Sequence, residues 1–213
     1  MIAGEAGGRR LGVPDGRNTR PTSDRAREGL FSTISSIAGP LAGLRVMDLY
    51  AGSGAVGIEA LSRGAAHVLL VESAAPALRV IRANIEAVGL AGAEVAADRV
   101  ERLLGRPPTA EPEAVPTAEP EAVPSAEPRA VSTAERRYDV VFADPPYALP
   151  AAEVTRVLEL LTKHGWLAPA ALVVIERATR DGDLTWPLGY RPDKARRYGE
   201  ATFWYGLAPR DLR

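Results

Sequence analysis

Short apolar runs bounded by turn residues divide the chain into the strands of one sheet. They are rich in Val, Leu, Ile and aromatic residues, as in strands buried on both faces. The runs cover residues 44–50, 68–72, 93–97, 138–143 and 172–176. A last run at 202–207 predicts a strand in a hairpin at the sheet edge, and residues 177–198 before it are expected to be irregular and basic.

Helical patterns lie between these runs. The first is an apolar stripe of Ala26, Leu30, Ile34 and Ile37, which follows the candidate capping residues Thr22, Ser23 and Asp24. Further helices are predicted from 55 to about 63, over 75–88 with Gly89 as a stop signal, and over 151–163. Strands that alternate with helices indicate an α/β fold.

The first two strands and the helix between them form a β-α-β unit with a glycine-rich turn. Gly52, Gly54 and Gly57 allow a ligand to approach the backbone, and the helix start offers free N–H groups to an anion. Asp48 lies beside this turn, and Glu72 ends the second strand, where it can accept from ribose hydroxyls. The other residues expected to contact a cofactor here are Tyr50, Ser53 and Ser73.

Two kinds of cofactor match this glycine spacing. Gly-x-Gly-x-x-Gly with an acid twenty residues beyond Gly52 is also the pattern of nicotinamide dehydrogenases. Asp48 counts against a dehydrogenase because its carboxylate would repel a pyrophosphate. It would instead attract the cationic methionine end of S-adenosylmethionine. The dehydrogenase interpretation also leaves residues 144–147 unexplained.

Asp98 follows the third strand. In this architecture the carboxyl end of that strand meets the cofactor's adenine, so Asp98 could accept from the adenine amino group. Asp98 could equally cap a helix at 99–104, and one residue can do both.

The strand at 138–143 ends in Asp144, Pro145, Pro146 and Tyr147. Proline has no N–H and a fixed φ, so the chain leaves the sheet extended and rigid and presents only acceptors. These acceptors are the Asp144 carboxylate and the neighbouring carbonyls, with the ring of Tyr147 as a flat wall beside them. Such a site suits a planar base with an exocyclic amino group. A proline-stiffened loop with an aspartate cap is the alternative.

Composition argues against other chemistries. The chain has no cysteine for a disulfide or thiolate site, and its two histidines show no ligand spacing, so no catalytic metal is expected. We find neither a signal peptide nor a long apolar run, and therefore expect a cytoplasmic protein without a membrane partner.

Residues 109–135 repeat the unit Thr-Ala-Glu-Pro-Glu-Ala-Val-Pro. Proline every four residues forbids a helix, and the segment is too polar for a core. We expect an exposed, extended or disordered insertion between the third and fourth strands. It carries six glutamates and one arginine, so the rest of the chain has net charge +4 although the whole has −1.

Arginine supplies most of the positive charge, with 24 Arg against 2 Lys, and suits bidentate phosphate contacts. Residues 1–29 are rich in Gly and Arg and are expected to form an extended arm or hairpin that faces nucleic acid. The residues predicted to bind nucleic acid are Arg9, Arg10, Arg20, Arg25, Arg27, Arg197 and Tyr198. The alternative for residues 1–29 is a solvated surface. The alternative for the segment with Arg197 and Tyr198 is a plain hairpin turn.

These motifs together resemble a known family. Residues 48–54 and 144–147 look like motifs I and IV of the amino-directed S-adenosylmethionine methyltransferases. The segments 7–11, 19–31 and 197–199 are similar to those of the bacterial 16S ribosomal RNA guanine-N2 methyltransferases of the RsmD type. The resemblance covers nearly the whole chain except residues 106–135.

The resemblance implies a Rossmann-like class I methyltransferase fold: a seven-stranded, mostly parallel sheet with helices on both faces and a small N-terminal arm. It implies an RNA-facing arm and helix at 1–37 and a methyltransferase domain at 38–213.

The implied reaction is methyl transfer from S-adenosylmethionine to the N2 of a guanine in 16S rRNA. The enzyme would act as a monomer on assembled 30S particles. Residues 144–147 would be catalytic, and Asp144 would also contact the cofactor. A DNA adenine-N6 methyltransferase and a non-catalytic RNA-binding assembly factor are the alternatives.

Overall fold

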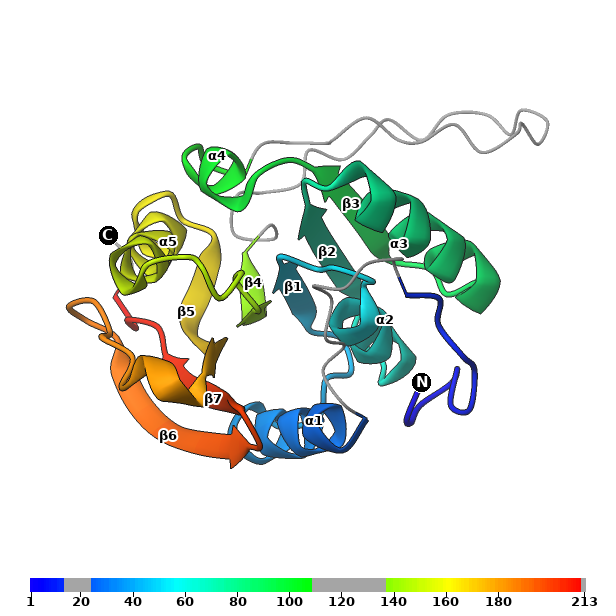
Figure 1. Cartoon of the computed structure of the whole chain (residues 1–213), viewed down its shortest axis with the longest axis horizontal. Helices are drawn as coiled ribbons and strands as arrows, with labels where there is room; N and C mark the ends of the chain where they lie inside the picture. The colour runs from blue at the N-terminus through cyan, green and yellow to red at the C-terminus, as the bar shows by residue number, and fades with distance from the viewer. Residues whose placement is uncertain (14–23, 109–136, 212–213) are drawn as a thin grey trace.

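One seven-stranded sheet forms the centre of the computed structural model, which describes residues 1–13, 24–108 and 137–211 (Figure 1). The strands are β1 (Arg45–Leu49), β2 (His67–Glu72), β3 (Ala93–Ala97), β4 (Tyr138–Ala143), β5 (Leu167–Ala178), β6 (Arg191–Tyr198) and β7 (Ala201–Leu207). Their order across the sheet is β3-β2-β1-β4-β5-β7-β6. Neighbours among β1 to β5 are parallel, and β7 is antiparallel to β5 and β6, which confirms the mostly parallel sheet.

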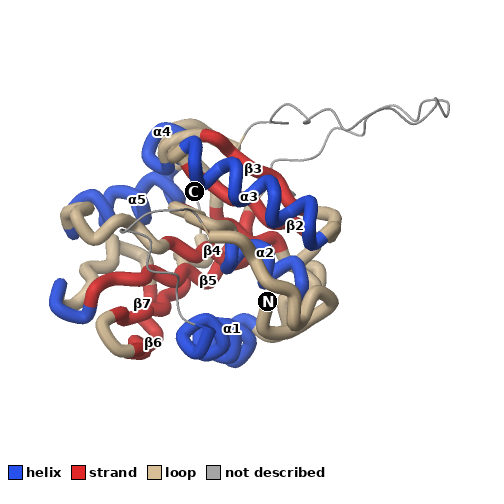
Figure 2. Tube along the Cα trace, turned by 45° about the vertical axis from the view of Figure 1, so that its right-hand side comes forward, coloured by secondary structure: helices blue, strands red, loops and turns tan. Residues whose placement is uncertain are grey.

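Helices cover both faces of this sheet (Figure 2). They are α1 (Asp24–Ala38), α2 (Ala55–Ser62), α3 (Ala75–Val88), α4 (Val100–Leu104) and α5 (Ala151–Lys163), with a short 3-10 helix η2 (Thr179–Asp181). Side chains alternate along a strand, so Val68 and Leu70 of β2 pack in the core under α1, α2 and α3. Leu69 and Val71 pack in the core under α4 and α5. The sheet therefore has a separate apolar core on each face.

The helix predicted after residue 23 is confirmed as α1, and it packs into the first of these cores. Leu30, Phe31 and Ile34 are at most 2% exposed. The helix also lies against the end of β6, since a Cβ at Gly29 would lie 2.1 Å from the Tyr198 hydroxyl. A side chain at position 29 would push the hairpin away, so Gly29 sets the distance between α1 and β6.

Residues 1–13 form an arm that lies against α2 and α3 and contains no helix or strand. The N–H groups of Ile2 and Ala3 donate to the buried carboxylate of Glu59 at 2.8 and 3.0 Å. Further along, the Gly12 N–H and carbonyl pair with the side-chain amide of Asn84 on α3, at 2.7 and 3.0 Å. Buried polar side chains therefore hold this N-terminal arm by its backbone.

The sequence prediction was wrong at one edge of the sheet. Residues 191–198 form β6, although irregular structure is predicted over 177–198. β6 is the outermost strand and most of its side chains are exposed, so its sequence has no apolar alternation to mark it. β5 also begins earlier than predicted, at Leu167, because Pro169 and Ala170 (φ 58°) interrupt the apolar pattern inside the strand.

No helix within residues 1–13, 24–108 and 137–211 is long and apolar enough to cross a membrane. The repeat at 109–135 and the segment 14–23, with Arg20, lie outside the described residues. The expectations for these segments remain predictions.

Candidate functional site

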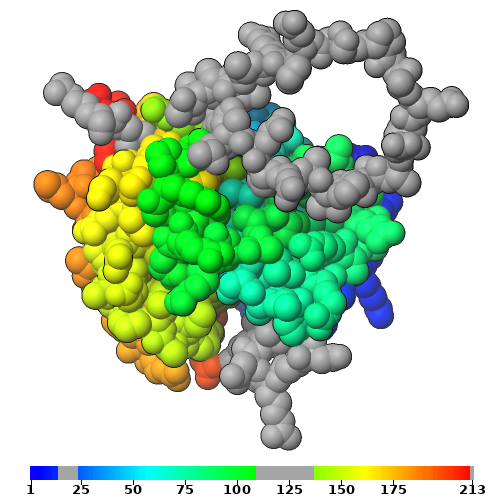
Figure 3. Space-filling model, turned by 90° about the horizontal axis from the view of Figure 1, so that it is seen from above, coloured from blue at the N-terminus to red at the C-terminus, as the bar shows by residue number. Residues whose placement is uncertain are grey.

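Four parallel strands end side by side at one edge of the sheet, and a residue predicted for the site lies at or just beyond each end. Leu49 of β1 pairs with Val71 of β2 and with Ala143 of β4. The residues brought together in this way are Tyr50, Glu72, Asp98 and Asp144. Figure 3 looks onto this edge, where α4 (green) lies between α5 and α3.

The glycine-rich turn between β1 and α2 depends on its glycines for two different reasons. Gly52 and Gly54 have φ of 57° and 76°, a region that other residues rarely adopt. A Cβ at Gly54 or at Gly57 would lie 2.9 Å from the side chain of Leu70, so these two glycines let α2 pack closely on β2. A Cβ at Gly52 would meet no atom closer than 4.0 Å, which leaves room for a ligand against the backbone.

Two carboxylates hold this turn in place. Asp48 accepts from the Gly57 N–H at 2.8 Å. Glu72 accepts from the Gly52 N–H at 3.0 Å with one oxygen, and from the two N–H groups that follow it in the chain at 2.7 and 2.8 Å with the other. Each carboxylate oxygen has two lone pairs, so the oxygen that binds Gly52 keeps acceptor capacity for one ribose hydroxyl.

A pocket of about 180 Å³, which we call the strand-end pocket, opens beside the turn. It is lined by Tyr50, Val71, Glu72, Ser73, Asp98, Arg99, Val100, Glu101, Pro146 and Leu149. Four of the residues predicted for the cofactor line it, namely Tyr50, Glu72, Ser73 and Asp98, whereas Asp48, Ser53, Asp144 and the turn glycines are not part of its lining. Apolar walls beside carboxylate acceptors fit an adenosine, which has a flat ring and hydroxyl donors.

Helix α4 provides one side of this pocket. Its Glu101 accepts from the Tyr50 hydroxyl at 2.8 Å, and Tyr50 itself has a φ of 60°, which is uncommon for a bulky residue. Asp98 accepts from the Arg99 N–H at 2.6 Å and pairs with Arg102 while it lines the pocket. The sequence analysis did not predict Glu101. The only indication was its position in the first turn of the helix that follows Asp98.

Asp48 is buried, Asp144 is half-buried, and the two carboxyl groups influence each other. Burial raises the pKa of Asp48 to about 8; the Gly57 N–H opposes this rise, and the carboxylates of Asp144 and Glu72 add to it. Burial also raises the pKa of Asp144 to about 7. Because three carboxylates converge where water is scarce, a cation beside them would be stabilised.

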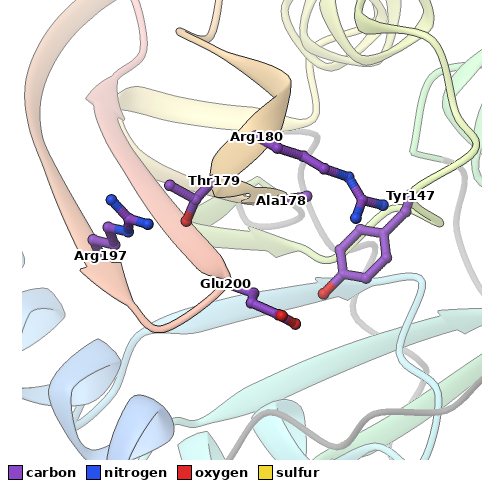
Figure 4. Close-up of a pocket in the computed structure, with 6 residues that line it drawn as sticks. All are labelled: Tyr147, Ala178, Thr179, Arg180, Arg197 and Glu200. Atoms are coloured by element: carbon purple, nitrogen blue, oxygen red, sulfur yellow. The ribbon is translucent and has the colours of Figure 1, made fainter.

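The Asp-Pro-Pro-Tyr loop (residues 144–147) and the residues just after it separate two pockets. Pro146 and Leu149 line the strand-end pocket, whereas Tyr147 lines a second pocket of about 430 Å³, which we call the hairpin pocket. The rest of its lining comes from the end of β5, η2 and the β6–β7 hairpin: Ala178, Thr179, Arg180, Arg197 and Glu200 (Figure 4). A ligand in either pocket would therefore touch the same short segment.

A buried arginine fixes this segment. Arg177, only 7% exposed, donates to the Leu149 carbonyl at 3.0 Å and pairs with Asp181 at 2.9 Å. The Leu149 N–H in turn donates to the Pro146 carbonyl at 2.8 Å. No sequence signal marks this role, because Arg177 begins a stretch in which many residues are basic.

Four of the residues predicted to bind RNA are exposed. Arg9 is one of them, and the other three are Arg10, Arg25 and Arg197, of which Arg197 also lines the hairpin pocket. Their positions are compatible with contacts to a phosphate backbone.

Three of the predicted residues make contacts within the protein. Arg9 donates to the Val88 carbonyl at the end of α3, at 2.7 Å. Arg27 is 7% exposed and pairs with Asp24 at 2.6 Å. The ring of Tyr198 lies 5.3 Å from that of Phe203, and its hydroxyl meets α1. These three side chains help to hold the arm, α1 and the hairpin in place.

Comparison with known proteins agrees with this geometry. A family described as "Conserved hypothetical protein 95" matches residues 1–115 and 121–206. The chain belongs to this family. Ribosomal RNA small subunit methyltransferase D of Escherichia coli K12 is 29% identical to it over 203 residues, which is 95% of this chain and 86% of that protein. The protein of the same name from Haemophilus influenzae is 28% identical over 177 residues, 83% and 77% of the two chains. The resemblance to RsmD-type methyltransferases is confirmed.

Several solved structures share the fold of this protein. The Escherichia coli protein yhhF, provisionally assigned as a methyltransferase, superposes with a TM-score of 0.76 and 27% identity over 99% of this chain and 98% of its own. A hypothetical protein of a Thermus species gives a TM-score of 0.68 and 31% identity over 98% and 97%. More distantly, a mutant of MtNAS in complex with S-adenosylmethionine gives 0.55 and 14% identity over 86% and 62%. The class I methyltransferase fold is confirmed.

Proposed function

We propose that this chain methylates the N2 amino group of a guanine in small-subunit rRNA, with S-adenosylmethionine as methyl donor, and that it acts as a monomer on assembled 30S particles. The relatives' names support methylation of rRNA. The observation that carries the proposal is the position of the Asp-Pro-Pro-Tyr loop at the boundary of two pockets, one suited to an adenosine and one large enough for a base.

The strand-end pocket is the proposed cofactor site. Glu72 would accept from a ribose hydroxyl and Asp98 from the adenine amino group, between the apolar side chains of Val71 and Leu149. Asp48, beside the glycine turn, would favour the cationic methionine end. When bound, S-adenosylmethionine supplies an electrophilic methyl group on a positively charged sulfur.

The loop itself is the proposed site of chemistry. An aryl amine is a poor nucleophile because its lone pair is delocalised into the ring. Asp144 and the Pro145 carbonyl would accept hydrogen bonds from the two N2–H groups, which draws the nitrogen toward tetrahedral geometry and frees its lone pair; as the methyl group leaves the sulfur for N2, one proton would pass to Asp144. Since the pKa of Asp144 is about 7, its carboxylate can take up a proton near neutral pH. Tyr147 would stack on the base, and the remaining requirement is positioning at about 3–3.5 Å.

An assay on ribosomal particles tests the function. Small subunits from cells that lack this protein are incubated with S-adenosylmethionine carrying a labelled methyl group, and the nucleosides are identified by mass spectrometry. We expect N2-methylguanosine from small-subunit rRNA and no label in duplex DNA. Asp144→Asn should abolish turnover and leave the cofactor Kd within about threefold, because it keeps the shape of the side chain. Label in DNA or in another nucleoside, or normal turnover by the variant, would contradict the proposal.

A further inference from the structure

The hairpin pocket places an acidic and a basic side chain next to Tyr147. Figure 4 shows the Glu200 carboxylate directed toward the hydroxyl end of the Tyr147 ring, and the Arg180 guanidinium beside the same ring nearer its Cβ end. Neither residue takes part in the chemistry proposed above. A base stacked on Tyr147 would have its polar edge near both charged groups.

The turn that carries Glu200 is held firmly. The Thr179 N–H donates to the Glu200 carbonyl at 2.7 Å. The Gly199 carbonyl accepts from the Thr179 hydroxyl at 3.4 Å and from Arg197 Nε at 3.2 Å. These bonds tie the β6–β7 turn to the end of β5 and to η2, so several elements set the backbone position from which the Glu200 side chain projects. Fixed placement is what selective hydrogen bonding requires.

Purines differ along the edge that this pocket would meet. Guanine presents the N2 amino group, the N1–H donor and the O6 acceptor in that order, whereas the adenine N1 is an acceptor. A carboxylate accepts from the guanine N1–H but repels the adenine N1 lone pair. An arginine donates to O6, as it does when it reads guanine in duplex DNA.

We propose that Glu200 and Arg180 select guanine in the hairpin pocket, with Glu200 accepting from N1–H and Arg180 donating to O6 while the N2 amino group is held at Asp144. This inference rests on the proposed function, because it concerns the base that the same site methylates. It assigns the choice of base to the C-terminal hairpin and η2, and the methyl transfer to the loop after β4.

The test compares two purines at the target nucleotide. Small subunits are reconstituted with 16S rRNA that carries either guanine or 2,6-diaminopurine at that position. The analogue keeps the N2 amino group but has an acceptor at N1 and an amino group in place of O6. We expect the wild-type protein to methylate guanine with a kcat/KM about 10- to 100-fold above that for the analogue.

Glu200→Gln should reduce this preference at least about tenfold, because the amide can donate to N1 of the analogue. Arg180→Ala is an independent second variant: it should lower kcat/KM for guanine and leave the value for the analogue unchanged. Glu159→Gln, at an exposed position of α5, is the matched control and should keep the wild-type preference. Glu200 is itself exposed in the turn, so the variant is expected to fold, as its Tm and cofactor Kd will show.

The outcomes separate the two proposals. If the wild-type protein methylates guanine but Glu200→Gln and Arg180→Ala both keep its preference over the analogue, the selection role is wrong and the proposed function stands. If the wild-type protein methylates the analogue as well as guanine, the selection role is also wrong. If it methylates neither, the proposed function fails and this inference fails with it.

Discussion

At the scale of single residues, the fold destabilises the ionised form of two acids near the strand ends. Asp48 and Asp144 have pKa values raised by burial to about 8 and about 7. Both are therefore partly protonated near neutral pH in the protein without ligand. A cationic cofactor beside them would favour their ionised forms, so its binding is linked to proton release.

The first prediction follows from this linkage. The affinity for S-adenosylmethionine should rise as the pH is raised from about 6 to about 9, because fewer protons must then be displaced from Asp48 and Asp144. Calorimetric titration in two buffers of different ionisation enthalpy should also show proton release at pH 7. Affinity that is flat or falls across this range would contradict the prediction.

The second prediction concerns stability. Asp48 is protonated in the folded protein up to about pH 8 but ionised in the unfolded chain above its ordinary value of 3.8, so the folded state binds more protons in between. The free energy of unfolding should therefore fall as pH rises from 3.8 to about 8 and should level off above that. His67 does not disturb the upper part of this range, because burial and then Arg45 lower its pKa to about 4.

Asp48→Asn tests this directly, since the amide keeps an acceptor for the Gly57 N–H and carries no charge. Urea unfolding at pH 6.5 and 8.5 should show a smaller loss of stability with pH in the variant than in the wild type. An equal loss in both proteins would show that Asp48 does not titrate as described.

Residues that follow a buried parallel strand could be predicted for the site, because the ends of such strands must meet at one edge. Glu72, Asp98 and Asp144 were found in this way. Glu101 and Arg177 were not predicted, because tertiary packing brings them to the site and the local sequence pattern gives no sign of that packing. The same holds for Glu200, which reaches Tyr147 only through the antiparallel addition of β7 and β6 to β5.

At the scale of elements, the N-terminal arm and the glycine turn share one anchor. Asn84 of α3, only 4% exposed, binds both backbone groups of Gly12 and also donates to the Ser53 carbonyl at 2.9 Å. The side-chain amide of Asn84 therefore links the arm, which is predicted to face RNA, to the turn, which is predicted to bind the cofactor.

The third prediction is that Asn84→Ala loosens both elements. It removes three hydrogen bonds of a buried side chain, two to the backbone of Gly12 and one to the Ser53 carbonyl, so we expect a loss of about 1–3 kcal/mol in the free energy of unfolding. The KM for the cofactor should rise severalfold, with a smaller change in kcat. Arg82→Ala, exposed on the same helix, is the control and should leave stability and KM near the wild-type values. Loss of stability without a change in KM would contradict the link to the turn.

Elements with a strong local pattern match their predicted bounds. α3, β3, β4 and α5 cover residues 75–88, 93–97, 138–143 and 151–163, as the apolar spacing indicates. β6 could not be found, because a strand with polar side chains on both faces carries no periodic signal and is formed by pairing with β7. Pairing with a neighbouring strand thus determines the structure where the local sequence has no periodic pattern.

At the scale of the whole molecule, positive charge gathers on the outer strand. Arg191, Arg196 and Arg197 of β6 are exposed, and the hairpin pocket lies at the end of this strand. Arg197 lines the pocket, and Arg191 and Arg196 lie on the other face of the strand, so β6 offers guanidinium groups to a phosphate chain on both faces.

The fourth prediction is that Arg196→Ala weakens RNA binding through charge alone. The dissociation constant for small-subunit rRNA should rise, and the slope of its logarithm against the logarithm of salt concentration should fall by about one. Filter binding at several salt concentrations measures both. Lys163→Ala, at the exposed end of α5, is the control and should leave the slope unchanged. An unchanged slope for Arg196→Ala would place the RNA elsewhere.

The outermost position of β6 has one more consequence. In the described part of the chain this strand has a neighbour on one side only, so its free edge could pair with the same edge of another molecule. Like charges along that edge keep two copies apart. Neutralising several of these arginines at once would then favour self-association through an extended intermolecular sheet, and concentrated salt would do the same by screening.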